Sequence, residues 1–212
     1  PMHGACLSGN LGVVKFFVEK GAQVSATTLD GTTPLHLACS RGHVDVIKFL
    51  VSEAGAEPFV APLSRVAQMS AFEVAAFFGL KDSVAAVLAA SVSVRDGDSL
   101  RSIIPKDAQE LLLLLFKSML YAVSAVKGSE DPDEQDQKRA ETLQHVLSLV
   151  PGRKLGVVAN TRSSISRSVF GISIEKGDTL LHAAARRGRG RCIQILLDAG
   201  ADVTQRNNCG DT

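Results

Sequence analysis

Two histidine–cysteine pairs with the same spacing are the first residues in this sequence that could do chemistry. His3 precedes Cys6 by three positions, and His36 precedes Cys39 by three. Imidazole and thiolate groups bind zinc, but a structural zinc site needs four ligands that converge. Each pair supplies two ligands, and no CxxC pair is present to complete a set. We therefore predict no metal site and no cofactor.

Signatures of catalysis are also missing from the sequence. Gly188-Arg189-Gly190 lacks the strand–loop–helix context of a phosphate-binding loop. The many serines form no GxSxG motif and have no evident histidine and aspartate partners. The acidic residues gather in one solvated run, 129–136, which is a poor setting for a catalytic carboxylate pair. We expect no catalytic residue and no enzyme activity.

A cluster of basic side chains has two interpretations. Arg186, Arg187, Arg189 and Arg191 lie close together, and Arg153, Lys154, Arg162 and Arg167 add to them in sequence. The cluster could bind an acidic partner, a phosphopeptide or an anionic lipid. It could instead be a solvated face balanced by the acidic run, through direct contact with it. We favour the second, because the net charge of the chain is only +1, and we expect no nucleic-acid partner.

The composition indicates a folded chain. Hydrophobic residues make up 45% of its 212 residues and charged residues 21%. No stretch resembles a signal peptide, and the most apolar run, 111–116, is far shorter than the ~20 residues of a membrane span. The four cysteines suggest no disulfide framework. We expect reduced thiols in the cytoplasm, with the nucleus as the alternative.

A repeated pattern organises both ends of the chain. Thr33-Pro34-Leu35-His36-Leu37-Ala38 is followed by Gly42, an apolar run and Gly55-Ala56. The same order occurs from Pro1 to Ala22, 33 positions earlier, and from Gly177 to Asp202. Thr33 can cap a helix and Pro34 suits its first turn, while Gly42 suits its end. The apolar run gives a second helix one buried face, which such a unit covers only by stacking.

These residues resemble the ankyrin repeat, in which a hairpin-like turn precedes two antiparallel helices. The resemblance implies an all-α ankyrin-repeat solenoid, with the histidine bridging adjacent turns and the cysteine standing where the family uses alanine. We name the clear copies the first (1–22), the second (29–56, with its hairpin) and the last complete copy (175–202, with its hairpin). Both chain ends fall within a repeat, so we expect a fragment of a longer protein.

The middle of the chain departs from the pattern. Residues 70–88 keep its small and apolar positions and are predicted to form a third copy, and 97–123 a fourth, badly eroded one. An acidic loop at 129–136, a helix over 138–150 and a finger loop or short hairpin over 153–175 follow. That helix could be the second helix of a further copy. The predicted organisation is ankyrin repeats at 1–123, an insert at 124–176, and ankyrin repeats again at 177–212.

The resemblance also implies a binding surface, made of the hairpin tips and the inner face of the first helices. In the first copy only Leu7 and Ser8 transfer. The remaining family-variable positions are Leu29, Asp30, Thr32, Ser40, Arg41, Met69, Phe77, Phe78, Glu175, Lys176, Asp178, Arg186 and Arg187. Phe77 and Phe78 could anchor an interface or pack beneath the insert, and the sequence leaves both open.

The function implied is that of a scaffold or adaptor that binds a protein or peptide, as a monomeric module. Two alternatives remain. The chain could be the regulatory arm of a larger enzyme or channel, or the arginine cluster could bind anionic lipid or a phosphopeptide. Membrane contact is expected only in that last form.

Overall fold

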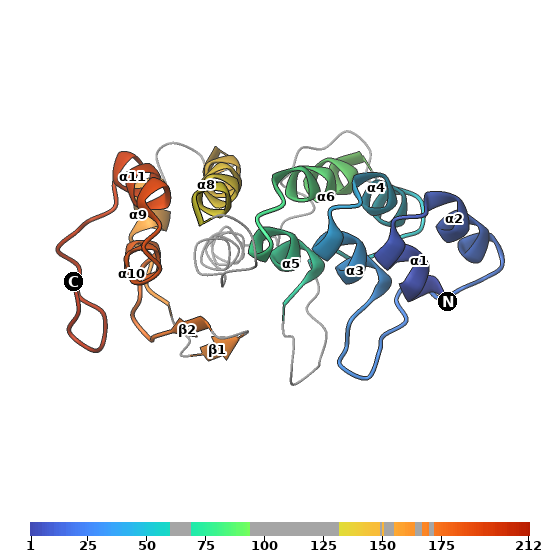
Figure 1. Cartoon of the computed structure of the whole chain (residues 1–212), viewed down its shortest axis with the longest axis horizontal. Helices are drawn as coiled ribbons and strands as arrows, with labels where there is room; N and C mark the ends of the chain where they lie inside the picture. The colour runs from blue at the N-terminus through green and yellow to red at the C-terminus, as the bar shows by residue number, and fades with distance from the viewer. Residues whose placement is uncertain (60–68, 94–131, 149, 151–154, 164–166, 170–171) are drawn as a thin grey trace. The chain divides into compact units, whose positions relative to one another are not determined.

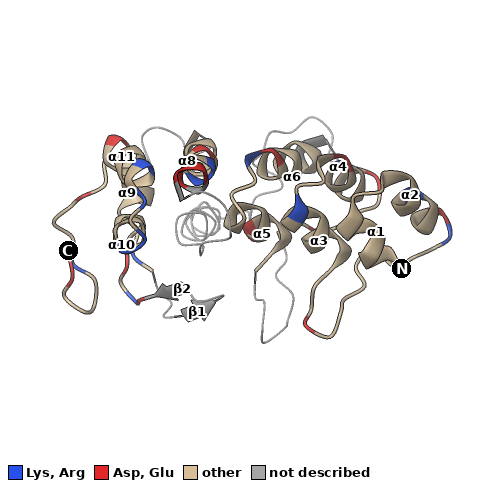
Figure 2. Ribbon diagram, viewed as in Figure 1, with Lys and Arg blue, Asp and Glu red and all other residues tan. Residues whose placement is uncertain are grey.

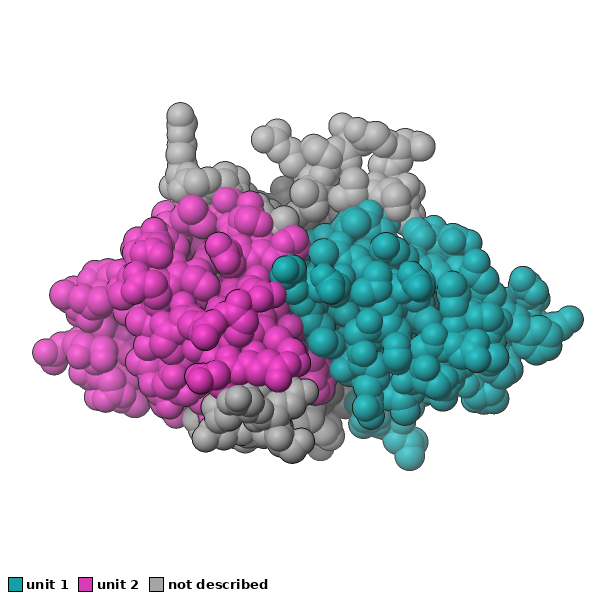
Figure 3. Space-filling model, turned by 45° about the horizontal axis from the view of Figure 1, so that its top comes forward, with its two compact units in different colours: residues 1–75, 80–110 teal, residues 76–79, 111–212 magenta. Residues whose placement is uncertain are grey.

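The computed structural model describes residues 1–59, 69–93, 132–148, 150, 155–163, 167–169 and 172–212. The chain divides into two units, shown in Figure 3. Unit 1 comprises 1–75 and 80–110, and unit 2 comprises 76–79 and 111–212. The predicted fourth copy, 97–123, lies outside the described residues.

Unit 1 is built from three successive helix pairs. Its helices are α1 (Met2–Ser8), α2 (Leu11–Glu19), α3 (Pro34–Arg41), α4 (Val44–Ser52), α5 (Ala71–Phe77) and α6 (Lys81–Ser93). Figure 1 shows the first helix of each pair in one layer and the second in another. Within these layers α1 packs against α3, and α4 against both α2 and α6. The stacked pairs confirm the predicted all-α solenoid.

The predicted caps define the ends of α3. The Thr33 hydroxyl accepts a hydrogen bond from the backbone N–H of His36, and the His36 side chain accepts one from the N–H of Thr33. Gly42 ends the helix in the left-handed region at φ 79°, which glycine adopts without strain. Its N–H donates to the Ala38 carbonyl. Thr179 and His182 form the same reciprocal cap in the last complete copy.

The third copy keeps this cap with different residues. The Ser70 N–H donates to the Glu73 carboxylate over 2.7 Å, and the Glu73 N–H donates to the Ser70 hydroxyl over 3.2 Å. Serine followed three positions later by glutamate is a capping box. This pair explains how α5 starts at the predicted place although the threonine, proline and histidine of the other copies are absent.

Unit 2 contains a longer helix, a short helix, a hairpin and a further helix pair. Its elements are α8 (Pro132–Ser148), α9 (Leu155–Ala159), β1 (Arg167–Val169), β2 (Ile172–Ile174), α10 (Leu180–Arg186) and α11 (Gly190–Asp198). The strands pair antiparallel, with Ser168 opposite Ser173. Helix α11 packs against both α8 and α10. The hairpin is one of the two predictions for 153–175.

The acidic run corrects one prediction. Its described part, 132–136, is the start of α8 and not a loop. Pro132 suits the first turn of a helix, where its missing N–H would have no intrahelical partner. The carboxylates of Asp133 and Glu134 interact favourably with the positive end of the helix dipole. Figure 2 shows acidic residues, in red, along the ribbon of α8. The predicted helix over 138–150 therefore begins six residues earlier.

Candidate recognition surface

Histidine side chains fix each hairpin to the copy before it. Nε2 of His3 lies 3.2 Å from the carbonyl of Thr32, and Nε2 of His36 lies 2.9 Å from that of Met69. His182 makes the same contact with the Asp211 carbonyl at 3.0 Å. Each histidine sits in the first helix of one copy and reaches the stem of the next hairpin. These bridges are the contacts that the repeat predicted for this residue.

The hairpin of the second copy is held rigid from within. The backbone N–H of Thr28 donates to the Thr32 carbonyl over 3.0 Å, which closes the turn. The Asp30 carboxylate accepts hydrogen bonds from the hydroxyls of Thr28 and Thr32. These two hydrogen bonds lower the pKa of Asp30, so it stays ionised. Leu29 stands at the tip with its side chain fully exposed.

The other predicted contact residues of unit 1 lie in the first helices of their pairs, α1 and α3. Leu7, Ser8 and Arg41 are exposed and Ser40 is half-buried. The hydroxyls of Ser8 and Ser40 donate to backbone carbonyls of their own helices, which leaves their oxygens able to accept. We name the set the unit 1 recognition surface: Leu7, Ser8, Leu29, Asp30, Thr32, Ser40 and Arg41.

Three of the predicted contact residues are buried, which corrects their place on a binding surface. Met69, Phe77 and Asp178 have almost no exposed side chain. The Met69 carbonyl contacts His36, and the Met69 side chain is buried in the core. The Phe77 carbonyl accepts a hydrogen bond from the Arg139 guanidinium of α8. The burial of its side chain agrees with the packing alternative, although this contact with α8 is made by the backbone.

Phe78 differs from its neighbour. Its side chain is 47% exposed, and its ring meets that of Phe77 edge to face with 5.1 Å between centroids. Such a pair holds the exposed ring in one orientation. Phe78 is therefore placed where a partner could touch it.

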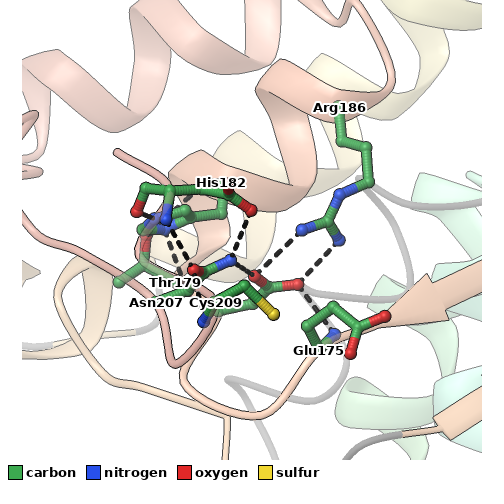
Figure 4. A network of polar contacts seen from close by, with 8 residues as sticks. Glu175, Thr179, His182, Arg186, Asn207 and Cys209 are labelled. Carbon is green, nitrogen blue, oxygen red and sulfur yellow. Dashed lines mark hydrogen bonds and ion pairs between the residues drawn. The ribbon is translucent and has the colours of Figure 1, made fainter.

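In the last complete copy, three of the five predicted contact residues, Glu175, Asp178 and Arg186, belong to an internal network (Figure 4). The Asp178 carboxylate accepts two hydrogen bonds from Arg186, at 2.7 and 3.1 Å, one from the Asn207 amide and one from the Glu175 N–H. Burial raises the pKa of Asp178, but the hydrogen bonds from Arg186, Asn207 and Glu175 outweigh it, so the pKa is lowered. Asp178 and Arg186 therefore stabilise the last complete copy itself.

Asn207 extends this network to the C-terminal hairpin. Its amide nitrogen donates to Asp178 and Asp211, and its side-chain oxygen accepts from the N–H groups of Cys209 and Asp211. The Asn208 N–H donates to the carbonyl of Lys176, whose side chain is exposed. Nothing in the sequence singles out Asn207 beyond its place in a turn, because its partner Asp178 is 29 positions away.

The arginine cluster is dispersed by the fold. Arg186 pairs with Asp178, Arg189 is buried, and Arg187 is half-buried. The guanidinium of Arg191 donates to Gln137 of α8, and its backbone N–H donates to Asp136. The second interpretation expected contact between the cluster and the acidic run, and here that contact is made by the backbone of Arg191, while its guanidinium binds the neutral Gln137. Arg162 is exposed and Arg167 lies in β1, while Arg153 and Lys154 fall outside the described residues.

Asp136 caps a helix that has no cap of its own. The residue before α11 is Arg189, whose side chain makes no capping hydrogen bond. The Asp136 carboxylate of α8 accepts from the Arg191 N–H in the first turn of α11 over 3.2 Å. A carboxylate there also suits the helix dipole. The contact therefore joins α8 to the last complete copy.

Removal of this cap should weaken that junction. Asp136→Ala is expected to lower the free energy of unfolding by about 1 kcal/mol, as the loss of an N-cap does. Urea denaturation measures it, with Gln144→Ala on the exposed face of α8 as the control. Equal midpoints for the two variants would show that Asp136 does not stabilise α11.

A segment after α8 also belongs to the last complete copy. The Asn160 amide nitrogen donates to the Gly200 carbonyl over 2.9 Å, and its oxygen accepts from the Asp202 N–H over 2.7 Å. Ser163 exchanges backbone hydrogen bonds with Asp178 and Gly177. Residues 155–163 are thus fastened to the repeat at two points, which the sequence analysis missed.

In the two histidine–cysteine pairs, the histidines form the bridges and the cysteines pack in the core. Cys6 and Cys39 are fully buried, and burial raises the pKa of the Cys6 thiol to about 11 and that of Cys39 still further. Burial likewise raises the pKa of Cys192 to about 12. All four cysteines are free. Among the described residues, no three His, Cys, Asp or Glu side chains are grouped as metal ligands.

No helix in the described part of the chain is long and apolar enough to cross a membrane. Comparison with known families finds matches at both ends of the chain. Residues 2–51 match the model for ankyrin repeats in many copies, and residues 176–208 match the model for the single ankyrin repeat. None of the curated proteins matches the chain. Ankyrin repeats generally mediate protein–protein interaction and are typically not catalytic. With the stacked helix pairs and histidine bridges, these matches show that residues 2–51 and 176–208 are ankyrin repeats.

Proposed function

We propose that the chain is a scaffold or adaptor module whose unit 1 recognition surface binds a segment of another protein. The observation that carries this proposal is Leu29, a fully exposed leucine at the tip of an ordered hairpin. A side chain at that place contributes nothing to packing within unit 1. The hydrogen bonds of Asp30 and the His3 bridge hold the tip still, so a partner that binds it loses less conformational entropy.

The chemistry of this surface favours a partner with an apolar anchor beside charged residues. Leu29 and Leu7 offer apolar contact, while Asp30 and Arg41 are exposed charged residues of the same unit. Apolar anchors with flanking polar contacts are the usual composition of an interface centre and rim. Phe78 and Lys176 are further candidates for contact in unit 2.

The other candidate functions have less support from the geometry. Binding of anionic lipid or phosphopeptide needs guanidinium groups that face solvent together, and Arg186, Arg189 and Arg191 are paired, buried or in contact with α8. A catalytic thiol needs an accessible thiolate, and three of the four cysteines are buried with raised pKa values. We accordingly propose a binding role without catalysis.

A regulatory arm of a larger enzyme or channel would use the same surface, so it remains compatible with this proposal. Free cysteines fit a reducing compartment, and we propose the cytoplasm, or the nucleus.

Affinity capture with quantitative mass spectrometry tests the proposal. Wild-type protein, Leu29→Asp and Arg41→Ala are compared as baits, with Lys48→Ala on the exposed side of α4 as the matched control. We expect one set of proteins to bind wild type and the control equally and to fall at least tenfold with Leu29→Asp. Thermal melting should stay within a few degrees for all variants, because each changed side chain is exposed. If both variants capture the same proteins as wild type in equal amounts, the proposed binding surface is wrong.

A further inference from the structure

The hairpin of the second copy contains an aspartate followed directly by a glycine. Asp30 precedes Gly31 in the turn 28–32, and Asp30 is exposed to solvent. In such a pair the backbone nitrogen of the glycine can attack the side-chain carboxyl carbon of the aspartate, because the glycine has no Cβ to hinder the approach. The exposed Asp30–Gly31 pair is therefore a candidate for spontaneous chemical rearrangement.

The rearrangement needs no reactant other than water. The nitrogen of Gly31 forms a bond to Cγ of Asp30, and its proton leaves with the hydroxyl of the protonated carboxyl group as water. The product is a five-membered succinimide ring, which takes up one water on hydrolysis. Opening at the side-chain carbonyl restores aspartate. Opening at the backbone carbonyl gives isoaspartate, in which the main chain runs through the former side chain.

The two threonines of the turn bind the carboxylate of Asp30. Its Oδ1 accepts a hydrogen bond from the hydroxyl of Thr28, and its Oδ2 accepts one from the hydroxyl of Thr32 over 3.1 Å. These hydrogen bonds lower the pKa of Asp30, which keeps the group ionised. An ionised carboxylate has no hydroxyl to lose as water and is a poor target for a nucleophile. The turn therefore opposes the attack at its carbon atom.

Hydrogen bonds of the turn also engage the attacking nitrogen. The N–H of Gly31 donates to the Thr28 carbonyl over 2.9 Å, and the N–H of Thr32 donates to the Thr28 hydroxyl over 3.1 Å. Gly31 has a φ of 82°, in the left-handed region that glycine adopts without strain. Ring closure removes the proton of Gly31 and has to break its hydrogen bond. The closed turn thus opposes the reaction at both reacting atoms.

We propose that Asp30–Gly31 is a site of spontaneous isoaspartate formation, which the hydrogen bonds of the closed turn hold in its native form. Conversion proceeds when the turn opens. Isoaspartate adds one carbon atom to the main chain and shortens the side chain that binds Thr28 and Thr32, so the turn cannot close on the same hydrogen bonds again. Because Leu29 lies in this turn, conversion also disrupts the proposed recognition surface, a consequence that rests on the proposed function.

Incubation at neutral pH and physiological temperature over several weeks tests the proposal. Trypsin releases the fragment 21–41, which separates this pair from the other Asp–Gly pair of the sequence, at 96–97. Protein-isoaspartate methyltransferase with a labelled methyl donor then measures isoaspartate in the fragment. Thr32→Val should convert about tenfold faster than wild type, because a hydrogen bond to a charged group favours the closed turn by about that factor. The chain unfolded in guanidinium chloride should convert fastest.

Thr27→Val, at an exposed threonine just before the turn, is the matched control and should convert like wild type. Asp30→Glu should give no signal in the fragment, because a glutamate would have to close a six-membered ring. Circular dichroism melts check that each variant folds, and Thr28→Val replaces Thr32→Val if the latter does not.

Equal rates in wild type, Thr32→Val and the unfolded chain would overturn the protection by the turn. An unfolded chain that forms no isoaspartate in this fragment would overturn the site itself. Neither result bears on the capture of partners by freshly prepared protein, so failure here is distinct from failure of the proposed function.

Discussion

Asp178→Ala is expected to lower the free energy of unfolding of unit 2 by about 3 kcal/mol, the largest effect of any polar substitution in that unit. The carboxylate is buried and accepts hydrogen bonds from Arg186, Asn207 and the Glu175 N–H. Its loss removes the acceptor that the guanidinium and the amide share, and it loosens the C-terminal hairpin. Arg186 is partly exposed, so water recovers some of the loss.

Chemical denaturation followed by circular dichroism measures the effect, with Asp198→Ala as the control. Asp198 accepts a hydrogen bond from Gln194 on the exposed face of α11, and its loss should cost under about 0.5 kcal/mol. Hydrogen exchange in 207–211 should also speed up in Asp178→Ala. Similar stabilities for the two variants would mean that the network of Figure 4 does not anchor the hairpin.

His36→Ala is expected to destabilise unit 1 by about 2–3 kcal/mol. The imidazole is buried, and it both caps α3 and reaches the Met69 carbonyl. Because the Thr33 N–H donates to Nδ1, that nitrogen is the acceptor and Nε2 carries the proton. The alanine variant leaves the Met69 carbonyl and the Thr33 N–H without these partners. Thermal melting measures the loss, and His145→Ala in α8 is the control.

The same histidine predicts a pH dependence. Burial lowers the pKa of His36, although the Met69 carbonyl and Asp30 oppose this shift. The unfolded chain then binds a proton more readily than the folded one, so stability falls as pH drops below about 6.5, the ordinary pKa of histidine. Between pH 7.5 and 5.5 the wild type should lose more stability than His36→Gln. Parallel pH profiles would contradict this contribution.

The sequence was informative wherever a contact is local or recurs with the repeat. The caps at Thr33 and Thr179, the left-handed glycines and the histidine bridges follow from residues within one unit or one period. The third copy was recognisable from its small and apolar positions, although its cap uses Ser70 and Glu73 in place of the usual residues. These features depend on hydrogen bonds between residues close in sequence or one repeat apart, so the sequence alone indicates them.

The sequence was uninformative where distant residues meet. Asp136 caps α11 across 55 positions, and Asn160 holds a turn 40 positions away. No spacing in the sequence relates such pairs, because the segments between them do not follow the repeat. The family pattern also predicted Asp178 as a contact residue, although it is buried in an ion pair with Arg186. The residue at the same position of the second copy, Thr32, carries no charge, so comparison of the copies does not reveal the pair. A buried carboxylate and its arginine are recognised only from their environment.

These contacts change how the insert should be tested. Deletion of 124–176 would remove α8, Asn160 and Ser163, and with them the cap of α11 and two attachments of the last complete copy. Loss of binding after such a deletion would therefore reflect misfolding of unit 2 and would not identify the residues that bind. Single exposed substitutions on the unit 1 recognition surface avoid this ambiguity.

The most direct measurement is the affinity of a captured partner for wild-type protein, Leu29→Asp and Arg187→Ala, determined by calorimetry. We expect Leu29→Asp to weaken binding at least tenfold, which is about 1.4 kcal/mol, and Arg187→Ala to leave it unchanged. Normal binding by Leu29→Asp together with a large loss in Arg187→Ala would place recognition at the arginine cluster and contradict the account.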